Sequence, residues 1–118
     1  MSSLTEKLWN YVFEPGAKKD FARLDGSLRD VVMKAIRRVR INPLPQSEGG
    51  YGKPLGNKGG SDLTGLLKVK LKKSGIRIVY YLVREAETMT IVVIGLRADS
   101  EVYKEAAQRI QLHKRQAQ

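Results

Sequence analysis

The stretch Leu66–Tyr80, LLKVKLKKSGIRIVY, decides how we expect this chain to fold. From Leu67 to Lys72, lysine alternates with a branched apolar residue, which is the period-two pattern of a strand with one apolar and one cationic face. Lys72–Gly75 then has the composition of a turn. A second strand is expected to begin at Ile76, so the stretch predicts an antiparallel hairpin.

The loop length sets the register of this hairpin. A four-residue loop places Lys70 directly opposite Arg77, whereas a two-residue loop places Lys72 there, and either register leaves the same face cationic. Like charges that face each other across strands destabilise a sheet. A face that keeps Lys68, Lys70 and Arg77, with no acid in the whole stretch, is therefore expected to bind an anion. The alternation also fits a solvated edge face, because lysine protects strand edges from aggregation.

Upstream of the hairpin, the pattern predicts one strand and two helices. The aromatic-rich run LWNYVF predicts a strand over 8–13, and a short helix is expected over 17–25, ended by Gly26. Ser27 is expected to cap a longer helix, whose apolar residues recur at i, i+3, i+4 and i+7. The other face of that helix is basic, and a solvated surface is the favoured interpretation there: Arg29, Lys34, Arg37, Arg38 and Arg40.

Residues 43–65 hold seven of the eleven glycines and three of the four prolines. We expect a Gly/Pro-rich surface loop, which is unusually long for a compact domain. Its run GGYGKPLGNKGG lacks the Gly-Lys-Ser/Thr ending of a phosphate-binding loop and precedes a strand, so that motif is not indicated. Tyr51 and Lys53 are candidate contacts to a ligand, and Leu55 is expected to anchor the loop.

The C-terminal part predicts a buried strand and a last helix. The nearly continuous apolar run 89–96 indicates a strand buried on both faces at the sheet centre. Asp99 or Ser100 is expected to cap the helix that follows, and residues 114–118 are expected to form a frayed tail with a solvated His113 before it. The order β-α-α-β-β-β-α predicts a single two-layer α+β domain over 1–118. Its small, mainly antiparallel sheet is expected to carry the helices on one face and the cations on the open face.

Composition narrows the function classes. The net charge of +10 favours a polyanionic partner such as nucleic acid, a membrane surface or an acidic protein. The absence of cysteine excludes disulfides, thiolate metal sites and cysteine nucleophiles. No apolar run approaches the roughly 20 residues of a membrane span, and the first residues lack the pattern of a signal peptide. We therefore expect a cytoplasmic protein without a membrane partner, cofactor or metal.

The expected site is a cationic cluster formed by Lys68, Lys70, Arg77 and Arg97 together with Tyr103. Guanidinium groups bind phosphate oxygens, and crowded cations lower the pKa of a neighbouring lysine, which can then accept a proton. A tyrosine ring can stack on a base. These parts suit attack of an RNA 2′-hydroxyl on its own phosphodiester, a reaction that needs no metal because RNA supplies the nucleophile.

The strings KVKLKKSGIRIVY and IGLRADSEVYKEAAQRI resemble the RelE branch of the RelE/ParE toxin superfamily over about residues 13–110. The resemblance implies a RelE-like fold and a toxin that cuts messenger RNA in the ribosomal A site and is held inactive by a cognate antitoxin. It implies that Lys68 and Lys70 are the base and its electrostatic partner, and that Arg77 stabilises the transition state. Arg97 would be the proton donor or phosphate clamp, and Tyr103 would orient or stack on a base.

Lys72, Lys73, Lys53 and Tyr51 are further candidate RNA contacts. Leu96 and Asp99 depart from the family pattern, and Asp99 is placed to compete for Arg97. Two alternatives stay open: a ParE-like toxin that inhibits a topoisomerase by binding, and a non-catalytic basic RNA- or DNA-binding module. The sequence leaves undetermined the codon preference, the antitoxin, the oligomeric state, whether this copy is active and the role of the Gly-rich segment.

Overall fold

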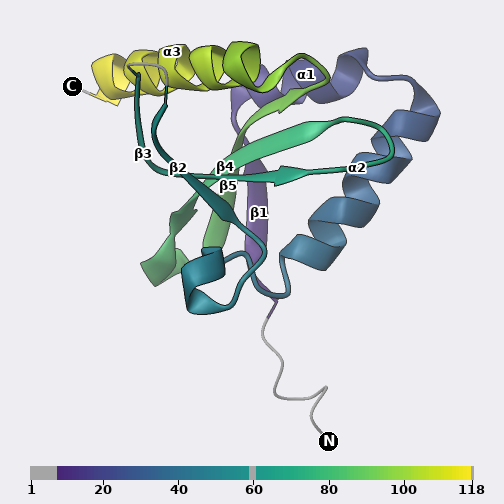
Figure 1. Cartoon of the computed structure of the whole chain (residues 1–118), viewed down its shortest axis with the longest axis horizontal. Coiled ribbons are helices and arrows are strands. Elements are labelled where there is room, and N and C mark those ends of the chain that lie inside the picture. Colours follow the sequence, from purple (N-terminus) through teal and green to yellow (C-terminus); the bar gives the residue numbers. More distant parts are fainter. Residues whose placement is uncertain (1–7, 59–60, 118) are drawn as a thin grey trace, which may run out of the picture.

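The computed structural model describes residues 8–58 and 61–117, within which three α-helices and five strands form (Figure 1). The helices are α1 (Pro15–Arg23), α2 (Gly26–Val39) and α3 (Asp99–Ala117). The strands are β1 (Asn10–Phe13), β2 (Lys53–Lys58), β3 (Ser61–Lys70), β4 (Arg77–Val83) and β5 (Thr88–Gly95). They form one sheet in the order β1-β5-β4-β3-β2, in which only the β1–β5 pair is parallel. The expected α+β fold with a small, mainly antiparallel sheet is confirmed.

Strand β5 lies inside the sheet, between β1 and β4, and is buried from Met89 to Ile94. Burial on both faces requires an apolar layer on each side of the sheet. Ile78 and Tyr80 of β4 belong to the core that α1 and α2 cover, whereas Val79 between them belongs to a second core with Val102 and Ala106 of α3. Because successive strand side chains point to opposite faces, α3 packs on the face opposite α1 and α2.

The expectation that all helices share one face, leaving the other open, is therefore wrong. The continuous apolar run of β5 left an apolar stripe on the supposedly open face, and α3 covers it. In Figure 1, α3 runs across the top of the sheet while α2 lies at its right-hand side. The residues expected to form a frayed tail, 114–118, lie in α3 as far as Ala117, and Gln118 lies outside the described residues.

Helix α2 begins two residues earlier than expected, because its N-cap is Asp25 and not Ser27. Asp25 is its N-cap: the carboxylate accepts hydrogen bonds from the Leu28 amide at 3.0 Å and from the Ser27 hydroxyl at 2.7 Å. Ser27 thus lies inside the helix, and Gly26 is its first residue, because α1 already ends at Arg23. Of the two possible caps, the charged carboxylate interacts more favourably with the positive end of the helix dipole.

The segment 43–65 is not one long loop. It contains a 3-10 turn (Gln46–Glu48), the edge strand β2 and the start of β3. The Tyr80 hydroxyl donates a buried 2.8 Å hydrogen bond to the Pro43 carbonyl, and a Cβ on Gly52 would lie 2.6 Å from that hydroxyl oxygen. Glycine therefore lets this turn pack directly on the core. Strand β2 was not predicted because proline disfavours strands in general. An edge strand such as β2 tolerates it.

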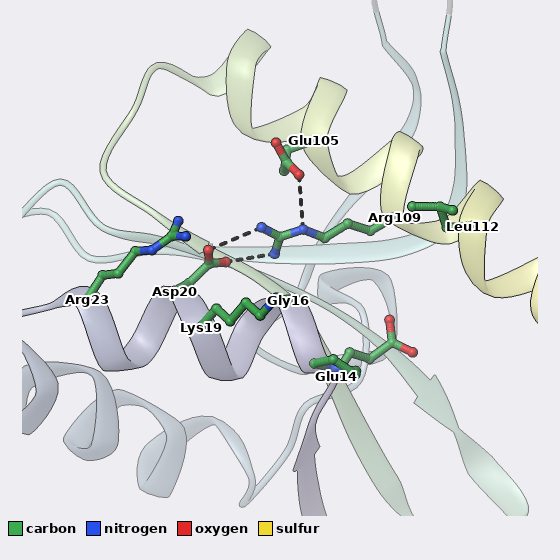
Figure 2. A pocket seen from close by; sticks show the side chains of 9 residues that line it. Glu14, Gly16, Lys19, Asp20, Arg23, Glu105, Arg109 and Leu112 are labelled. Carbon is green, nitrogen blue, oxygen red and sulfur yellow. Dashed lines mark hydrogen bonds and ion pairs between the residues drawn. The ribbon is translucent and has the colours of Figure 1, made fainter.

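Helix α3 is tied to α1 by a group that we call the α1–α3 clamp: Asp20, Glu105 and Arg109. Figure 2 shows Arg109 of α3 between Asp20 of α1 and Glu105. Arg109 donates to both Asp20 oxygens at 2.7 and 3.1 Å, and also to the Val92 carbonyl at 2.7 Å. Asp20 accepts from the Ile94 amide at 3.0 Å. The pairing of β5 with β1 ends at Ile91. Beyond that point, the clamp supplies the hydrogen-bond partners of the β5 backbone groups that β1 does not reach.

Candidate functional site

The cationic face predicted from the hairpin is present. Lys70 pairs with Arg77 across β3 and β4, and Lys53 pairs with Lys68 across β2 and β3, so four cations share one face. Of the two loop lengths that the sequence left open, the structure has the four-residue loop: the Leu71 amide donates to the Ile76 carbonyl at 2.8 Å, and Gly75 adopts a φ of 79°. Two like-charged cross-strand pairs are unfavourable in isolation.

An acid that the hairpin itself lacks lies among these cations. Asp99, the first residue of α3, accepts a hydrogen bond from Arg77 Nε at one oxygen, and its other oxygen lies 3.3 Å from Lys68 Nζ. We call Lys68, Arg77 and Asp99 the Asp99 cluster. The side chains of Lys68 and Arg77 are 11% and 13% exposed, whereas that of Asp99 is 43% exposed. One exposed carboxylate therefore joins two largely buried cations.

Arg77 is held by more than this carboxylate. Its Nη1 donates to the Gly75 carbonyl at 2.9 Å and to the Arg97 carbonyl at 2.7 Å. The first bond ties the guanidinium to the β3–β4 turn, and the second ties it to the segment between β5 and α3. A guanidinium fixed in this way is pre-organised for an anion that presents two oxygens, such as a phosphate or a carboxylate.

Lys68 differs from the expected proton acceptor. Its Nζ lies 5.3 Å from the centre of the Tyr103 ring, a cation–π distance. Burial by itself would lower the pKa of Lys68, but its interactions with Tyr103 and then Asp99 outweigh this, and the net pKa is raised. The hydrogen bond from Arg77, and then the charge of Lys68, lower the pKa of Asp99 against the effect of its burial. Lys68 thus stays charged, contrary to the lowered lysine pKa that cation crowding predicted.

Arg97 is only partly in the cluster. Its carbonyl binds Arg77, but its guanidinium is 56% exposed and lies 3.6 Å from the Glu105 carboxylate. Asp99 was expected to compete for Arg97, and instead it pairs with Lys68 and Arg77.

The other candidates surround the cluster rather than join it. Lys70 and Lys53 are exposed on the same face, and Lys72 and Lys73 are exposed in the β3–β4 turn. Tyr51, whose exposed fraction is 47%, lies on the turn before β2. Exposed cations at the rim suit a flexible polyanion.

The α1–α3 clamp contains functional-looking residues that the sequence did not indicate. Beside it lies a pocket of ≈ 500 Å³, whose lining carries charges of both signs: Glu14, Lys19, Asp20, Arg23, Glu105 and Arg109. Mixed charge offers no single-sign surface for an anion, so the clamp is a weaker candidate than the cationic face. Among the residues that the structure describes, no group of three potential metal ligands occurs, and no helix is long and apolar enough to cross a membrane.

Comparison with known proteins identifies the family to which this chain belongs. Family profiles give no match. The chain is 30% identical over 98 residues to the mRNA interferase toxin RelE of Escherichia coli K12, which spans 83% of this chain and 93% of that protein. An mRNA interferase RelE of Shigella flexneri matches to the same extent. The chain belongs to the RelE toxin family. The family resemblance predicted from the two sequence strings is thus confirmed.

Solved RelE structures agree with the fold. The isolated Escherichia coli RelE toxin has a TM-score of 0.61 at 26% identity, covering 86% of this chain and 98% of that one. An Escherichia coli RelE arginine double mutant in complex with an antitoxin RelB peptide has a TM-score of 0.63 at 26% identity, covering 85% and 95%. The match extends over nearly the whole RelE domain, so the RelE-like architecture is confirmed for this chain.

Proposed function

We propose that this RelE-family protein is the toxin of a type II toxin–antitoxin system and cleaves messenger RNA in the A site of the ribosome. Its relatives are named mRNA interferases. The observation that carries the proposal is the convergence of Lys68 and Arg77 on one anion position, with Lys70 beside Arg77 across the hairpin and the Tyr103 ring against Lys68. A phosphodiester has the charge and the paired oxygens that this position accepts.

In the proposed reaction, the 2′-oxygen of the message attacks the adjacent phosphorus and the bond to the 5′-oxygen breaks. The products are a 2′,3′-cyclic phosphate and a 5′-hydroxyl. Arg77 stabilises the negative charge of the transition state, and Lys68, which stays protonated, adds a second positive charge. Of Lys68 and Lys70, which are expected to be the base and its electrostatic partner, Lys70 is therefore the base that accepts the 2′-hydroxyl proton.

The leaving 5′-oxygen requires a proton donor. We assign this role to Arg97, which must first leave Glu105. Tyr103, held by the N-terminal half of α3, orients the RNA or stacks on a base, and Lys53, Lys72, Lys73 and Tyr51 bind the flanking strand. No step of this reaction uses a metal or a cofactor.

The proposed partners of this toxin are a cognate antitoxin, which holds it inactive, and the ribosome with its message, on which it acts. All of these interactions are proposed to take place in the cytoplasm. A related RelE has been solved with a peptide of its antitoxin RelB. The net charge of +10 suits an acidic or partly disordered segment that wraps the domain. Purification of the native operon products is expected to yield a second small protein bound to this one, and recovery of the toxin alone would contradict the assignment.

The decisive test is primer extension on a defined message, with and without programmed ribosomes, for wild type and Arg77→Ala. Wild type is expected to cut inside the A-site codon only when ribosomes are present, whereas Arg77→Ala binds the ribosome but does not cut. Arg37→Ala, an exposed arginine of α2, is the matched control and should cut like wild type. Fragments with a 5′-phosphate would contradict attack by the 2′-hydroxyl.

The same experiment separates the two alternatives. A topoisomerase-binding toxin would give no cuts with any variant. A non-catalytic basic module would give no cuts and would lose RNA affinity by similar amounts for Lys68→Ala, Lys70→Ala and Arg77→Ala, with a steep dependence on salt.

A further inference from the structure

The anion position of the Asp99 cluster is already occupied by the protein itself. The Asp99 carboxylate divides its two oxygens between Arg77 Nε and Lys68 Nζ. Each cation thus contacts a separate oxygen of one planar anion, as two non-bridging oxygens of a phosphate would be contacted. A carboxylate that bridges two largely buried cations occupies the place that the proposed substrate requires.

Asp99 is also the part of the cluster that solvent reaches most easily. Its side chain is 43% exposed, while those of Lys68 and Arg77 are 11% and 13% exposed. Asp99 is the first residue of α3 and follows the segment that connects β5 to α3. Its backbone is therefore part of a helix end, whereas Lys68 and Arg77 belong to strands of the sheet. An anion that arrives from solvent therefore competes with Asp99 for two cations that the sheet holds in place.

We propose that Asp99 is an internal occupant of the phosphate position, which the backbone phosphate of the message must displace before cleavage. This inference rests on the proposed function. A phosphodiester carries one negative charge, as the Asp99 carboxylate does, so exchanging one for the other changes the local charge little. Displacement then depends on contacts elsewhere, or on a substrate held at a high effective concentration beside the site.

Under the proposed function, this arrangement makes a free message a poor substrate. A flexible single strand loses conformational entropy when it binds, and at the Asp99 cluster it only replaces an anion already present. A message held in the ribosomal A site has its strand ordered beforehand, so the exchange is favourable there. Asp99 thus makes the ribosome a requirement of this chain's own cationic site.

The test uses Asp99→Asn, which keeps the shape of the side chain and removes its charge. The matched control is Glu101→Gln, which removes the same charge from an exposed position two residues along α3. The probe is a short RNA with a 2′-deoxy nucleotide at the cleavage position, so binding is measured without reaction. Affinity for the free protein is measured by fluorescence anisotropy at fixed salt.

Asp99→Asn is expected to bind the probe roughly tenfold more tightly than wild type, because the two cations lose their internal competitor. Glu101→Gln is expected to change affinity less than about twofold, since the charge of an exposed side chain is screened by solvent and salt. Asp99→Asn should also cut ribosome-free RNA measurably where wild type does not. Equal affinities for the two variants, or weaker binding by Asp99→Asn, would overturn the proposal.

A measurement on wild type alone covers the case in which Asp99→Asn folds poorly. Inorganic phosphate at high concentration, whose dianion carries one more negative charge than the Asp99 carboxylate, is expected to shift the Arg77 Nε–H resonance on titration, and no shift would contradict displacement. The two proposals fail separately. Ribosome-dependent cutting without tighter binding by Asp99→Asn would contradict only the proposal that Asp99 occupies the phosphate position. Tighter binding without any cutting would contradict only the proposed nuclease function.

Discussion

The two charged groups that α3 brings to the sheet have opposite compositions. The Asp99 cluster has two cations and one acid, and its acid is 43% exposed. The α1–α3 clamp has one cation and two acids, and its Arg109 and Asp20 side chains are only 19% and 12% exposed. One lies at the start of α3 and the other lies ten residues further along the same helix.

The difference separates a structural ion pair from a binding site. In the clamp, the bonds among Arg109, Asp20 and the β5 backbone close on one another and leave little for a ligand to gain. In the Asp99 cluster, one carboxylate offsets only one of two positive charges, and Lys70 and Lys53 add further cations on the same face. A surplus of positive charge beside an exposed carboxylate attracts an anion, whereas a largely buried group with more acids than cations does not.

The largest effect is expected from breaking the clamp. Asp20→Ala leaves Arg109 mostly buried without its main partner and the Ile94 amide without an acceptor. We expect a loss of roughly 3–5 kcal/mol in the free energy of unfolding and a melting temperature lower by roughly 10 °C or more. Asp30→Ala, at an exposed aspartate of α2, is the control and should change stability by less than about 0.5 kcal/mol. A similar loss in both variants would deny the clamp its structural role.

The second effect contrasts the two arginines directly. Arg77→Lys keeps the charge but loses the forked donor, so we expect cleavage of ribosome-bound message to fall roughly 10²-fold. Arg109→Lys should instead lower the melting temperature and leave the cleavage rate of the folded protein close to that of wild type. The two measurements are single-turnover cleavage and thermal unfolding. If both variants lost rate and stability alike, the proposed division between site and clamp would be wrong.

A smaller effect is expected from Gly16→Ala, which disturbs the clamp without removing a charge. A Cβ on Gly16 would lie 2.8 Å from the guanidinium carbon of Arg109, and the bonds of that guanidinium limit how far it moves. We expect a loss of about 1 kcal/mol in the free energy of unfolding by denaturant, despite the better helix propensity of alanine. Gly26→Ala, where the nearest group is 3.8 Å away, should be neutral or stabilising. Stabilisation in both variants would show that Arg109 relocates freely.

The smallest effect is the pH dependence of the Asp99 cluster. Arg77, and then Lys68, lower the pKa of Asp99 below its ordinary 3.8. The stabilisation from Asp99 is therefore fully present above that ordinary value and is lost as the pH falls through the lowered value. We expect Asp99→Asn to be less stable than wild type at neutral pH by less than about 1 kcal/mol, since the Asp99 carboxylate is 43% exposed and its interactions are screened by solvent. The difference should vanish in acid, and an unchanged difference there would contradict the ion pair.

The sequence predicted the parts of the fold that depend on local pattern. The alternation from Leu67 to Lys72 was sufficient to place Lys68, Lys70 and Arg77 on one face, but it left open whether Lys70 or Lys72 lies opposite Arg77. The register depends on the loop length, and the structure has Lys70 opposite Arg77. Strand β2 escaped prediction since KPLGNK has low strand propensity and forms through its pairing with β3. The face on which α3 packs depends on the second apolar stripe of the sheet, which alternation within one strand does not reveal.

The candidate site was predictable in membership and less so in contacts. The alternation of residues in the hairpin placed Lys68, Lys70 and Arg77 on one face, but the partner of an acid depends on the path of the chain between β5 and α3. From the sequence, Asp99 was therefore expected to interact with the nearby Arg97. In the structure it pairs with Arg77 and Lys68, which lie 22 and 31 residues away along the chain. Asp20 and Arg109 are 89 residues apart, and no local pattern joins them.

The parallel pairing of β1 with β5 sets the order in which this protein can be completed during its synthesis. Asn10 pairs with Thr88, so the first strand to be made waits for the last strand, and α3 with Asp99 and Tyr103 is made later still. Domains fold as units only once their long-range contacts are available. A nascent chain therefore lacks the assembled cationic face until the C-terminal helix has left the ribosome that produces it. The molecule that is proposed to attack translating ribosomes thus completes its own site only after α3 has been translated.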